Sequence, residues 1–408
     1  MTAAPARRPP VGPGLFGSGV LVAVGIAVGQ VLGYALLVLG ARLLGPSVFG
    51  ELGTLMGLLT IGAVVPLAAQ TVTARRVAGH DVGSDPPTLA RLGMLAAVVV
   101  TVVALAFVPV AVALLDLDPL ATTLVALTLF PLTVAYAGAG LAQGRQLFGV
   151  LAVIYAVLAL GRTGAAVLTL ITTHSVRAVM VATLAGTVVA WLLVQRRSGL
   201  PWRCSRGVPR PVTVELSHVT HALLAMFVFT NADLLLARAR LTPEDAGVYA
   251  AGAIILKIAF WLPQAVAVVV FPSLAEGRAG AMSRGAGVVV GLGLAVTAAV
   301  AFLGPWLLPI ALGPGYAAIT GEAWLFGLAG TAQAVVYLLL FGRLAAQDRL
   351  AAIAMWVAVL ALGGIVVLSG ASSPRDVVVA VLGVSLVLCV AGAWAHARRS
   401  DQPGSASR

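Results

Sequence analysis

Long uninterrupted apolar runs dominate the chain, and polar residues gather in short segments between them. Each run holds about 20 residues or more, which is the length a helix needs to cross a bilayer core of about 30 Å. Several runs begin or end at Gly or Pro, which is typical of turns between helices. The pattern predicts twelve membrane-spanning helices, near residues 15–40, 48–71, 90–115, 119–142, 147–172, 176–195, 216–237, 246–272, 286–311, 317–342, 350–369 and 375–396.

Composition supports a membrane protein. Of the 408 residues, 60% are hydrophobic and only 10% are charged, whereas a soluble domain is about 45–50% apolar and about one quarter charged. So few charges cannot cover a soluble protein of this length, which excludes a soluble enzyme and a disordered chain. The net charge of +11 is carried by residues that lie between apolar runs. We therefore expect membrane lipids, and not nucleic acid, as the partner of these charges, and the cell membrane as the location.

The basic residues, 24 Arg and one Lys, are distributed unevenly between alternate loops. If the N-terminus is cytoplasmic, 18 of the 25 lie in inside segments, five lie in outside loops, and Arg162 and Lys257 lie within spans. Positive residues concentrate on the cytoplasmic side of membrane proteins. The distribution predicts an even number of spans with both termini in the cytoplasm.

The two halves of the chain carry a repeat. At a constant offset of 197 residues, four pairs of identical residues align, namely Leu44 with Leu241, Pro46 with Pro243, Gly50 with Gly247, and Pro66 with Pro263. Both copies begin in the same orientation, so we expect a parallel repeat with a substrate site between the halves. The fold class predicted is an all-α integral membrane protein with twelve transmembrane helices in two six-helix lobes.

The most Arg- and Pro-rich loop divides these lobes. The predicted organisation is an N-terminal lobe over 1–195, a cytoplasmic linker over 196–214, a C-terminal lobe over 215–397 and a cytoplasmic tail over 398–408. Because one chain supplies both halves of the repeat, a monomer can enclose the pathway, and we expect a monomer.

The repeated segments also carry a family resemblance. The residues concerned are Arg42-Leu43-Leu44-Gly45-Pro46 with Phe49-Gly50, then Thr230-Asn231-Ala232-Asp233, Pro243, Gly247, Tyr249 and Phe271-Pro272, and finally Gly313-Pro314-Gly315-Tyr316. This pattern resembles polysaccharide-type flippases (O-antigen and exopolysaccharide translocases) of the multidrug, oligosaccharidyl-lipid and polysaccharide exporter superfamily. The second copy departs from it, with Leu241-Thr242-Pro243 in place of Leu-Gly-Pro. The resemblance implies a transporter that moves lipid-linked saccharides from the inner to the outer leaflet by alternating access.

Three ionisable residues lie inside predicted spans, where charge is costly and usually functional. They are Arg162 in the fifth span, Asp233 in the seventh and Lys257 in the eighth. In one interpretation Asp233 and Lys257 form a structural ion pair. In another, Arg162 and Lys257 face a central cavity and hold an anionic head group, while Asp233 tunes or releases it. Snorkelling toward the interface is a third possibility. An excess of cations favours a pyrophosphate-bearing lipid over a cationic drug, and Arg162 is the first candidate for a phosphate contact.

Neutral polar residues in the spans are more often partners in hydrogen bonds between helices than ligands of a saccharide. They are Gln30, Tyr34, Gln70, Asn231, Gln264 and Gln333, among which Gln30, Asn231 and Gln264 are candidate polar contacts in the cavity.

Glycines and prolines in the spans suggest packing and bending. Gly25, Gly29 and Gly33 recur at every fourth residue, which favours close helix packing, with bending of the first helix during gating as the alternative. Pro66 and Pro263 predict matched kinks at equivalent depths, because each proline removes a backbone hydrogen bond.

Enzymatic chemistry finds little support. The five His residues are scattered, and there is no phosphate-binding Gly-rich loop with a Lys. We expect no catalytic residue, no metal and no cofactor.

The expected function is export of a polyprenyl-diphosphate-linked saccharide for cell-surface polysaccharide synthesis, with a polymerase and glycosyltransferases as candidate partners. A cation-coupled multidrug exporter that uses Asp233 is the main alternative, and a membrane scaffold that transports nothing is a third.

Overall fold

The computed structural model describes residues 13–274, 281–345 and 349–400, and these ranges are almost entirely helical. The helices are α1 (Pro13–Leu44), α2 (Pro46–Gly62), α3 (Val64–Gly79), α4 (Pro86–Leu115), α5 (Pro119–Gly144), α6 (Phe148–Leu158), the π-helix η1 (Ala159–Gly164), α7 (Ala165–Thr173), α8 (Val176–Ser198), α9 (Arg210–Arg240), α10 (Pro243–Leu274), α11 (Ala281–Leu312), the 3-10 helix η2 (Pro314–Ile319), α12 (Ala323–Ala345), α13 (Arg349–Leu368) and α14 (Pro374–Ser400).

These helices occupy all twelve predicted spans. The second span is α2 followed by α3, and the fifth is α6, η1 and α7 in succession. Ten helical segments of the described chain are long and apolar enough to cross a membrane, and α10 and α12 fill the other two predicted spans. The chain is thus a multi-pass membrane protein. The tenth span begins later than predicted, because Pro314–Ile319 forms the separate 3-10 helix before α12 starts at Ala323.

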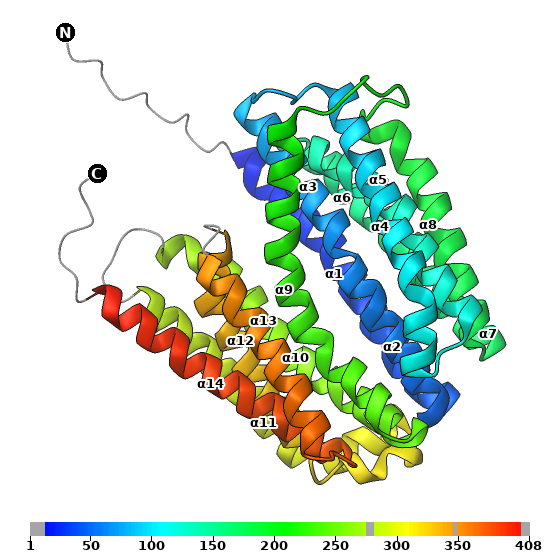
Figure 1. The fold of residues 1–408 in the computed structure, drawn as a ribbon, viewed down its shortest axis with the longest axis vertical. Helices are drawn as coiled ribbons and strands as arrows, with labels where there is room; N and C mark the ends of the chain where they lie inside the picture. Colours follow the sequence, from blue (N-terminus) through cyan, green and yellow to red (C-terminus); the bar gives the residue numbers. More distant parts are fainter. Residues whose placement is uncertain (1–12, 275–280, 346–348, 401–408) are drawn as a thin grey trace.

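The six helical spans of each half form one lobe. In Figure 1 the N-terminal lobe, drawn from blue to blue-green, and the C-terminal lobe, drawn from the bright green of α9 to red, converge at the bottom and separate toward the upper left. The long helix α9 runs between them and packs against α2 and α3 of the first lobe as well as α13 of the second. The connection between the lobes runs from Ser198 to Arg210, within the predicted linker.

Helix ends repeat between the lobes at the predicted offset. Pro46 is the first residue of α2 and Pro243 is the first residue of α10, while Leu115 ends α4 and Leu312 ends α11. A proline at the first helical position is favourable because that position has no intrahelical use for an N–H. The duplication inferred from sequence therefore covers at least the first three spans of each lobe.

The second span bends where Pro66 requires it. Pro66 has no N–H to donate to the carbonyl of Gly62, and the helix is interrupted at Ala63, between α2 and α3. The hydrogen bonds on either side are kept, from Ala63 N to Leu59 O and from Leu67 N to Ala63 O.

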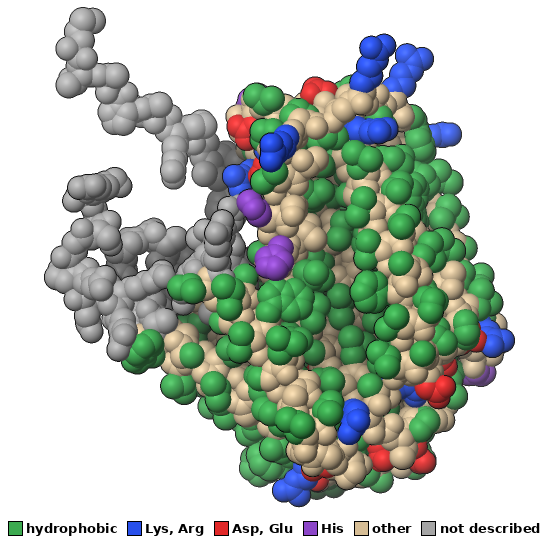
Figure 2. Space-filling model, viewed as in Figure 1, with side chains coloured by type: hydrophobic (Ala, Val, Ile, Leu, Met, Phe, Trp, Pro, Cys, Tyr) green, Lys and Arg blue, Asp and Glu red, His purple; other side chains and the backbone are tan. Residues whose placement is uncertain are grey.

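Charged side chains lie mainly at the two ends of the molecule. On the face in Figure 2, blue and red atoms cluster at the top and near the bottom, and green apolar side chains cover the surface between them. We call the end that carries the connections 79–86, 144–148 and 198–210 the arginine-rich end. The opposite end, with the connections 44–46, 115–119, 240–243 and 312–323, is the arginine-poor end. The positive-inside rule predicts that the arginine-rich end is cytoplasmic.

Candidate functional site between the two lobes

The lobes meet most closely where α2 crosses α10 near the arginine-poor end. A Cβ added to Gly50 would lie 2.9 Å from the backbone N of Gly247, and one added to Gly247 would lie 1.7 Å from the carbonyl oxygen of Pro46. One helical turn further, a Cβ on Gly53 would lie 3.1 Å from the Cβ of Ala250. The residue pairs Gly50–Gly247 and Gly53–Ala250 are each separated by 197 residues, so equivalent positions of the repeat pack against each other across the interface.

Other motif residues lie just before α2 and α10, the two helices that form this crossing. Gly45 has φ +73 immediately before α2, a left-handed conformation that favours glycine. In the second copy the equivalent residue is Thr242, which is not among the described non-glycine residues with positive φ, so a residue other than glycine can stand there.

A polar cluster lies inside the C-terminal lobe, between α9 and α10. The Lys257 ammonium donates to Asn231 Oδ1 at 2.7 Å, and Asn231 Nδ2 donates to the Phe227 carbonyl at 2.8 Å. The Tyr249 hydroxyl donates to Asp233 Oδ2 at 3.0 Å. Asn231, Asp233 and Tyr249 are almost fully buried.

The cluster brings Asp233 and Lys257 into the same region without a direct ion pair between these two described side chains. Lys257 bonds to Asn231, which lies two residues before Asp233, while Asp233 Oδ1 is buried with no hydrogen-bond partner. The side chain of Asn231 thus takes the position next to the ammonium that the sequence suggested for the carboxylate.

Arg162 lies in the N-terminal lobe, within the π-helix η1 that interrupts the fifth span. Single π-helical turns are rare in helices and often mark functional positions. This turn packs against α8, where a Cβ on Gly186 would lie 1.8 Å from the carbonyl oxygen of Gly161. Arg162 is half-buried and forms no hydrogen bond or ion pair with any described residue. It is therefore a cation about midway along a span, with no counter-charge among the described residues.

Three further predicted site residues are Gln30, Pro263 and Gln264. Gln30 is exposed on α1. The side chains of Pro263 and Gln264 lie outside the described residues, although α10 passes through both positions.

The glycine stripe on α1 packs closely over only part of its length. A Cβ on Gly25 would lie 3.0 Å from the carbonyl oxygen of Ala152, and one on Gly29 would lie 3.5 Å from the Cβ of Ala159. No atom lies within 4 Å of such a Cβ on Gly33, so the expectation of close packing is wrong there. Bending at Gly29 or Gly33 stays a prediction.

Gln70 makes hydrogen bonds between helices, the role that its residue type favours in a span. Its Nε2 donates to Gln143 Oε1 at 2.8 Å and to the Tyr155 hydroxyl at 2.5 Å, which joins α3 to α5 and α6.

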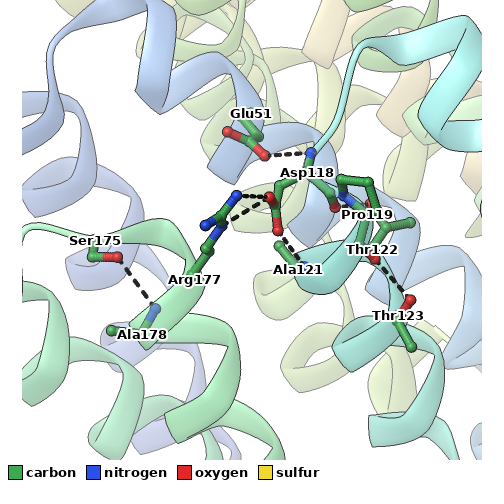
Figure 3. A network of polar contacts seen from close by, with 9 residues as sticks. All are labelled: Glu51, Asp118, Pro119, Ala121, Thr122, Thr123, Ser175, Arg177 and Ala178. Atoms are coloured by element: carbon green, nitrogen blue, oxygen red, sulfur yellow. Dashed lines mark hydrogen bonds and ion pairs between the residues drawn. The ribbon is translucent and has the colours of Figure 1, made fainter.

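A second polar network lies at the arginine-poor end of the N-terminal lobe (Figure 3). Arg177 Nε donates to Asp118 Oδ2 at 2.8 Å, Ala121 N donates to Asp118 Oδ1 at 2.8 Å, and Asp118 N donates to Glu51 Oε1 at 2.9 Å. Partial burial of Asp118 raises its pKa, but the hydrogen bonds from Arg177 and Ala121 outweigh this and hold the pKa below its ordinary value. The network joins α2, α5 and α8, and so it fixes the start of α2 within its lobe.

Sequence reasoning missed the contacts that cross between the lobes, because it counted Arg238 only as an outside charge and Arg42 only as an outside charge and a residue of the family motif. Arg42 Nη1 donates to the Ile310 carbonyl at 2.7 Å, and Arg238 Nε donates to the Leu115 carbonyl at 2.9 Å. The Tyr316 hydroxyl also donates across the lobes, to the Ala41 carbonyl at 3.0 Å. Each arginine stands two residues before the end of the first helix of its lobe, although the offset of 197 pairs Arg42 with Ala239 and not with Arg238.

No protein-family model matches the sequence, and no curated relative matches it. The fold is nevertheless similar to solved structures. A lipid II flippase MurJ in an inward closed conformation aligns with a TM-score of 0.72 and 11% identity, covering 93% of this chain and 87% of that chain. A multidrug resistance MATE family transporter of the MOP superfamily in an inward-facing conformation aligns with a TM-score of 0.68 and 12% identity, covering 94% of this chain and 100% of that chain.

The likeness depends on conformation. An outward-facing MATE family transporter aligns with a TM-score of 0.56 and 13% identity, covering 96% of each chain, which is less than the 0.68 of the inward-facing structure. At these identities the comparisons establish a two-lobed fold like that of these structures, and the described chain aligns better with the inward-facing MATE structure than with the outward-facing one.

Proposed function

We propose that this protein is a membrane transporter that works by alternating access of its two lobes. Its fold is that of structures described as transporters and a flippase. The lobes pack tightly at the arginine-poor end through Gly50 and Gly247, and the positive-inside rule predicts that this is the outer end. The structure then corresponds to an inward-facing state, and transport requires the α2–α10 crossing to separate.

The proposed substrate is a polyprenyl-diphosphate-linked saccharide, flipped from the inner to the outer leaflet for synthesis of cell-surface polysaccharide. The observation that carries this proposal is Arg162, a cation inside a span without a partner among the described residues. An intramembrane arginine is costly unless a counter-charge or water compensates it. Because the guanidinium binds phosphate oxygens in a bidentate manner, a diphosphate is a chemically matched partner. In this account Lys257 adds positive charge from the second lobe.

A cation-coupled multidrug exporter is the second candidate function, and one observation favours it. Asp233 Oδ1 is buried with no hydrogen-bond partner, as expected for an acceptor that takes up a proton or cation during transport. The nearby ammonium of Lys257 opposes a bound cationic drug, since like charges repel in a medium of low dielectric constant. For this reason we place the flippase first.

A binding measurement separates the two candidates. Purified protein in detergent would be mixed with a polyprenyl-diphosphate disaccharide or with a lipophilic cationic dye, and binding would be read by native mass spectrometry and fluorescence. The flippase proposal expects disaccharide binding that Arg162→Ala weakens at least tenfold. Arg196→Ala, which removes an exposed arginine at the arginine-rich end, is the matched control and should bind as the wild type does. Dye binding that Asp233→Asn abolishes, with no disaccharide binding, would support the exporter instead.

The remaining parts of the proposal concern the cell. We place the protein in the cell membrane as a monomer with both termini in the cytoplasm, in contact with membrane lipids, and we propose the polymerase and glycosyltransferases of the same polysaccharide as partners. Cysteine accessibility at positions 196 and 174, on opposite ends of the helices, tests this orientation. Labelling of position 196 only after the membrane is permeabilised is the expected result.

A further inference from the structure

Two arginines link the lobes in a reciprocal way at the arginine-poor end. Arg42, near the end of α1 in the first lobe, donates from Nη1 to the carbonyl of Ile310 in α11 of the second lobe. Arg238, near the end of α9 in the second lobe, donates to the carbonyls of Leu115 and Asp116 at the end of α4 in the first lobe, at 2.9 and 2.7 Å. In both directions the first span of one lobe reaches the third span of the other.

The carbonyls of Leu115 and Ile310 both lie in the last turn of their helix, where C=O groups lack an intrahelical donor, and a proline follows each of them at the position four residues later. In a continuing helix the carbonyl of residue i accepts from the N–H of residue i+4. Four residues after Leu115 stands Pro119, and four residues after Ile310 stands Pro314. Neither proline has an N–H, so neither can supply the missing donor, and an arginine from the opposite lobe supplies one.

Electrostatics adds to these hydrogen bonds. The C-terminal end of a helix carries partial negative charge, and a cation placed there is favourable. The Arg238 side chain is only 6% exposed, whereas the Asp116 carboxylate is 94% exposed and lies 4.0 Å away. Arg238 therefore interacts mainly with the helix end and less with that carboxylate. Arg42 is exposed, so its contact is the weaker of the two.

We propose that Arg42 and Arg238 form a reciprocal arginine clasp that holds the arginine-poor end closed and must open in every transport cycle. The clasp rests on the alternating-access function proposed above, and it adds the contacts that set the balance between the two states. When the lobes separate, both arginines lose their acceptors. The carbonyls of α4 and α11 then lose a donor that their own helix does not replace. Opening therefore carries a cost to which both lobes contribute, with the larger share at buried Arg238.

Distances between spin labels test the clasp without any substrate. Labels at Thr173→Cys in the first lobe and Ala318→Cys in the second, both exposed near the arginine-poor end, would be measured by pulsed electron paramagnetic resonance in lipid nanodiscs. The background would carry Cys204→Ser and Cys389→Ala. Wild type should show mainly a short distance, and Arg238→Ala should shift at least half of the molecules to a longer one. Arg42→Ala should cause a smaller shift in the same direction.

Two further variants keep the test decisive. Arg240→Ala removes a neighbouring exposed arginine and should leave the distances unchanged. Arg238→Lys keeps the charge but not the two-point contact of the guanidinium, so it reports on the clasp even if Arg238→Ala does not fold, and it should give an intermediate shift. Unchanged distances in Arg42→Ala and Arg238→Lys would overturn the clasp. If these variants open the arginine-poor end but the wild-type protein moves no lipid-linked saccharide, the clasp is supported and the substrate proposal fails.

Discussion

The first two spans of the two lobes pack alike at the arginine-poor end but differ in their interiors. Gly50 of α2 and Gly247 of α10 are equivalent positions, and each leaves no room for a side chain at the crossing. Deeper in the lobes the same offset pairs Leu36 with Asp233 and Leu52 with Tyr249. Both leucines are buried in the apolar core, whereas Asp233 and Tyr249 are hydrogen-bonded to each other.

This difference indicates which part of the repeat is constrained by symmetry. The crossing involves both copies at once, so a larger residue in either copy would separate the lobes. Away from the crossing the equivalent positions carry different residues, although α9 still packs against α2 and α3 of the first lobe. The buried contact between Asp233 and Tyr249 belongs to the C-terminal lobe. The second span of the N-terminal lobe carries Gln70 instead, and that lobe contributes a cation from its fifth span, at Arg162.

The largest effect on stability should come from breaking the shared crossing. Gly247→Ala places a Cβ against the Pro46 carbonyl, and we expect a loss of roughly 1–3 kcal/mol in unfolding free energy from overpacking. Gly33→Ala is the control, because its Cβ meets no atom within 4 Å, and alanine is the better helix former by about 0.5–1 kcal/mol. Thermal unfolding followed by tryptophan fluorescence should show a lower midpoint for Gly247→Ala alone. Equal midpoints for the two variants would contradict the tight crossing.

An intermediate effect should follow from making the second lobe resemble the first. Asp233→Leu removes the acceptor of the buried Tyr249 hydroxyl, which costs about 1–3 kcal/mol when the hydroxyl is left without a partner. Adding Tyr249→Phe removes that orphaned group, so the double variant should recover part of the loss. A double-mutant cycle on unfolding midpoints measures the coupling. Additive effects would show that the two side chains act independently and that the contact contributes nothing.

The smallest effect concerns the network that holds α2 in its own lobe. The pKa of Asp118 is lowered in the folded protein, so its ionised form adds stability that is fully present above the unfolded pKa of about 3.9. This contribution disappears as the pH falls through the lowered folded pKa. Asp118→Asn should therefore reduce the unfolding midpoint at pH 7, and the difference from wild type should shrink below about pH 4. A difference that stays constant down to pH 3 would be inconsistent with a charged Asp118.

Apolar run length alone predicted the twelve spans, because the bilayer fixes the length of a helix that crosses it. The ends of the helices were less predictable, since they depend on local caps. For example, α4 begins at Pro86, where the Asp85 side chain accepts a hydrogen bond from Thr88 N. The repeat also identified Gly50 and Gly247 before their contact was known.

The sequence did not predict which polar residues form hydrogen bonds with each other. Depth along the helices placed Asp233 and Lys257 in one region, but the direction of each side chain decides that Lys257 bonds to Asn231. The π-helical turn at Arg162 likewise lies in close contact with α8 at Gly186, a contact that the sequence did not predict. The cross-lobe contacts of Arg42 and Arg238 require the assembled repeat, since each joins residues more than 120 positions apart.

The most direct test of the central claim is a flipping assay in proteoliposomes that contain a fluorescent polyprenyl-diphosphate disaccharide. A membrane-impermeant quencher is added outside, and the readout is the loss of fluorescence from lipid that was initially protected in the inner leaflet. The account predicts that wild type and Arg196→Ala move the lipid between leaflets, and that Arg162→Ala slows this movement at least tenfold while inserting normally. Equal rates for wild type and Arg162→Ala, or no movement above that of protein-free liposomes, would contradict it.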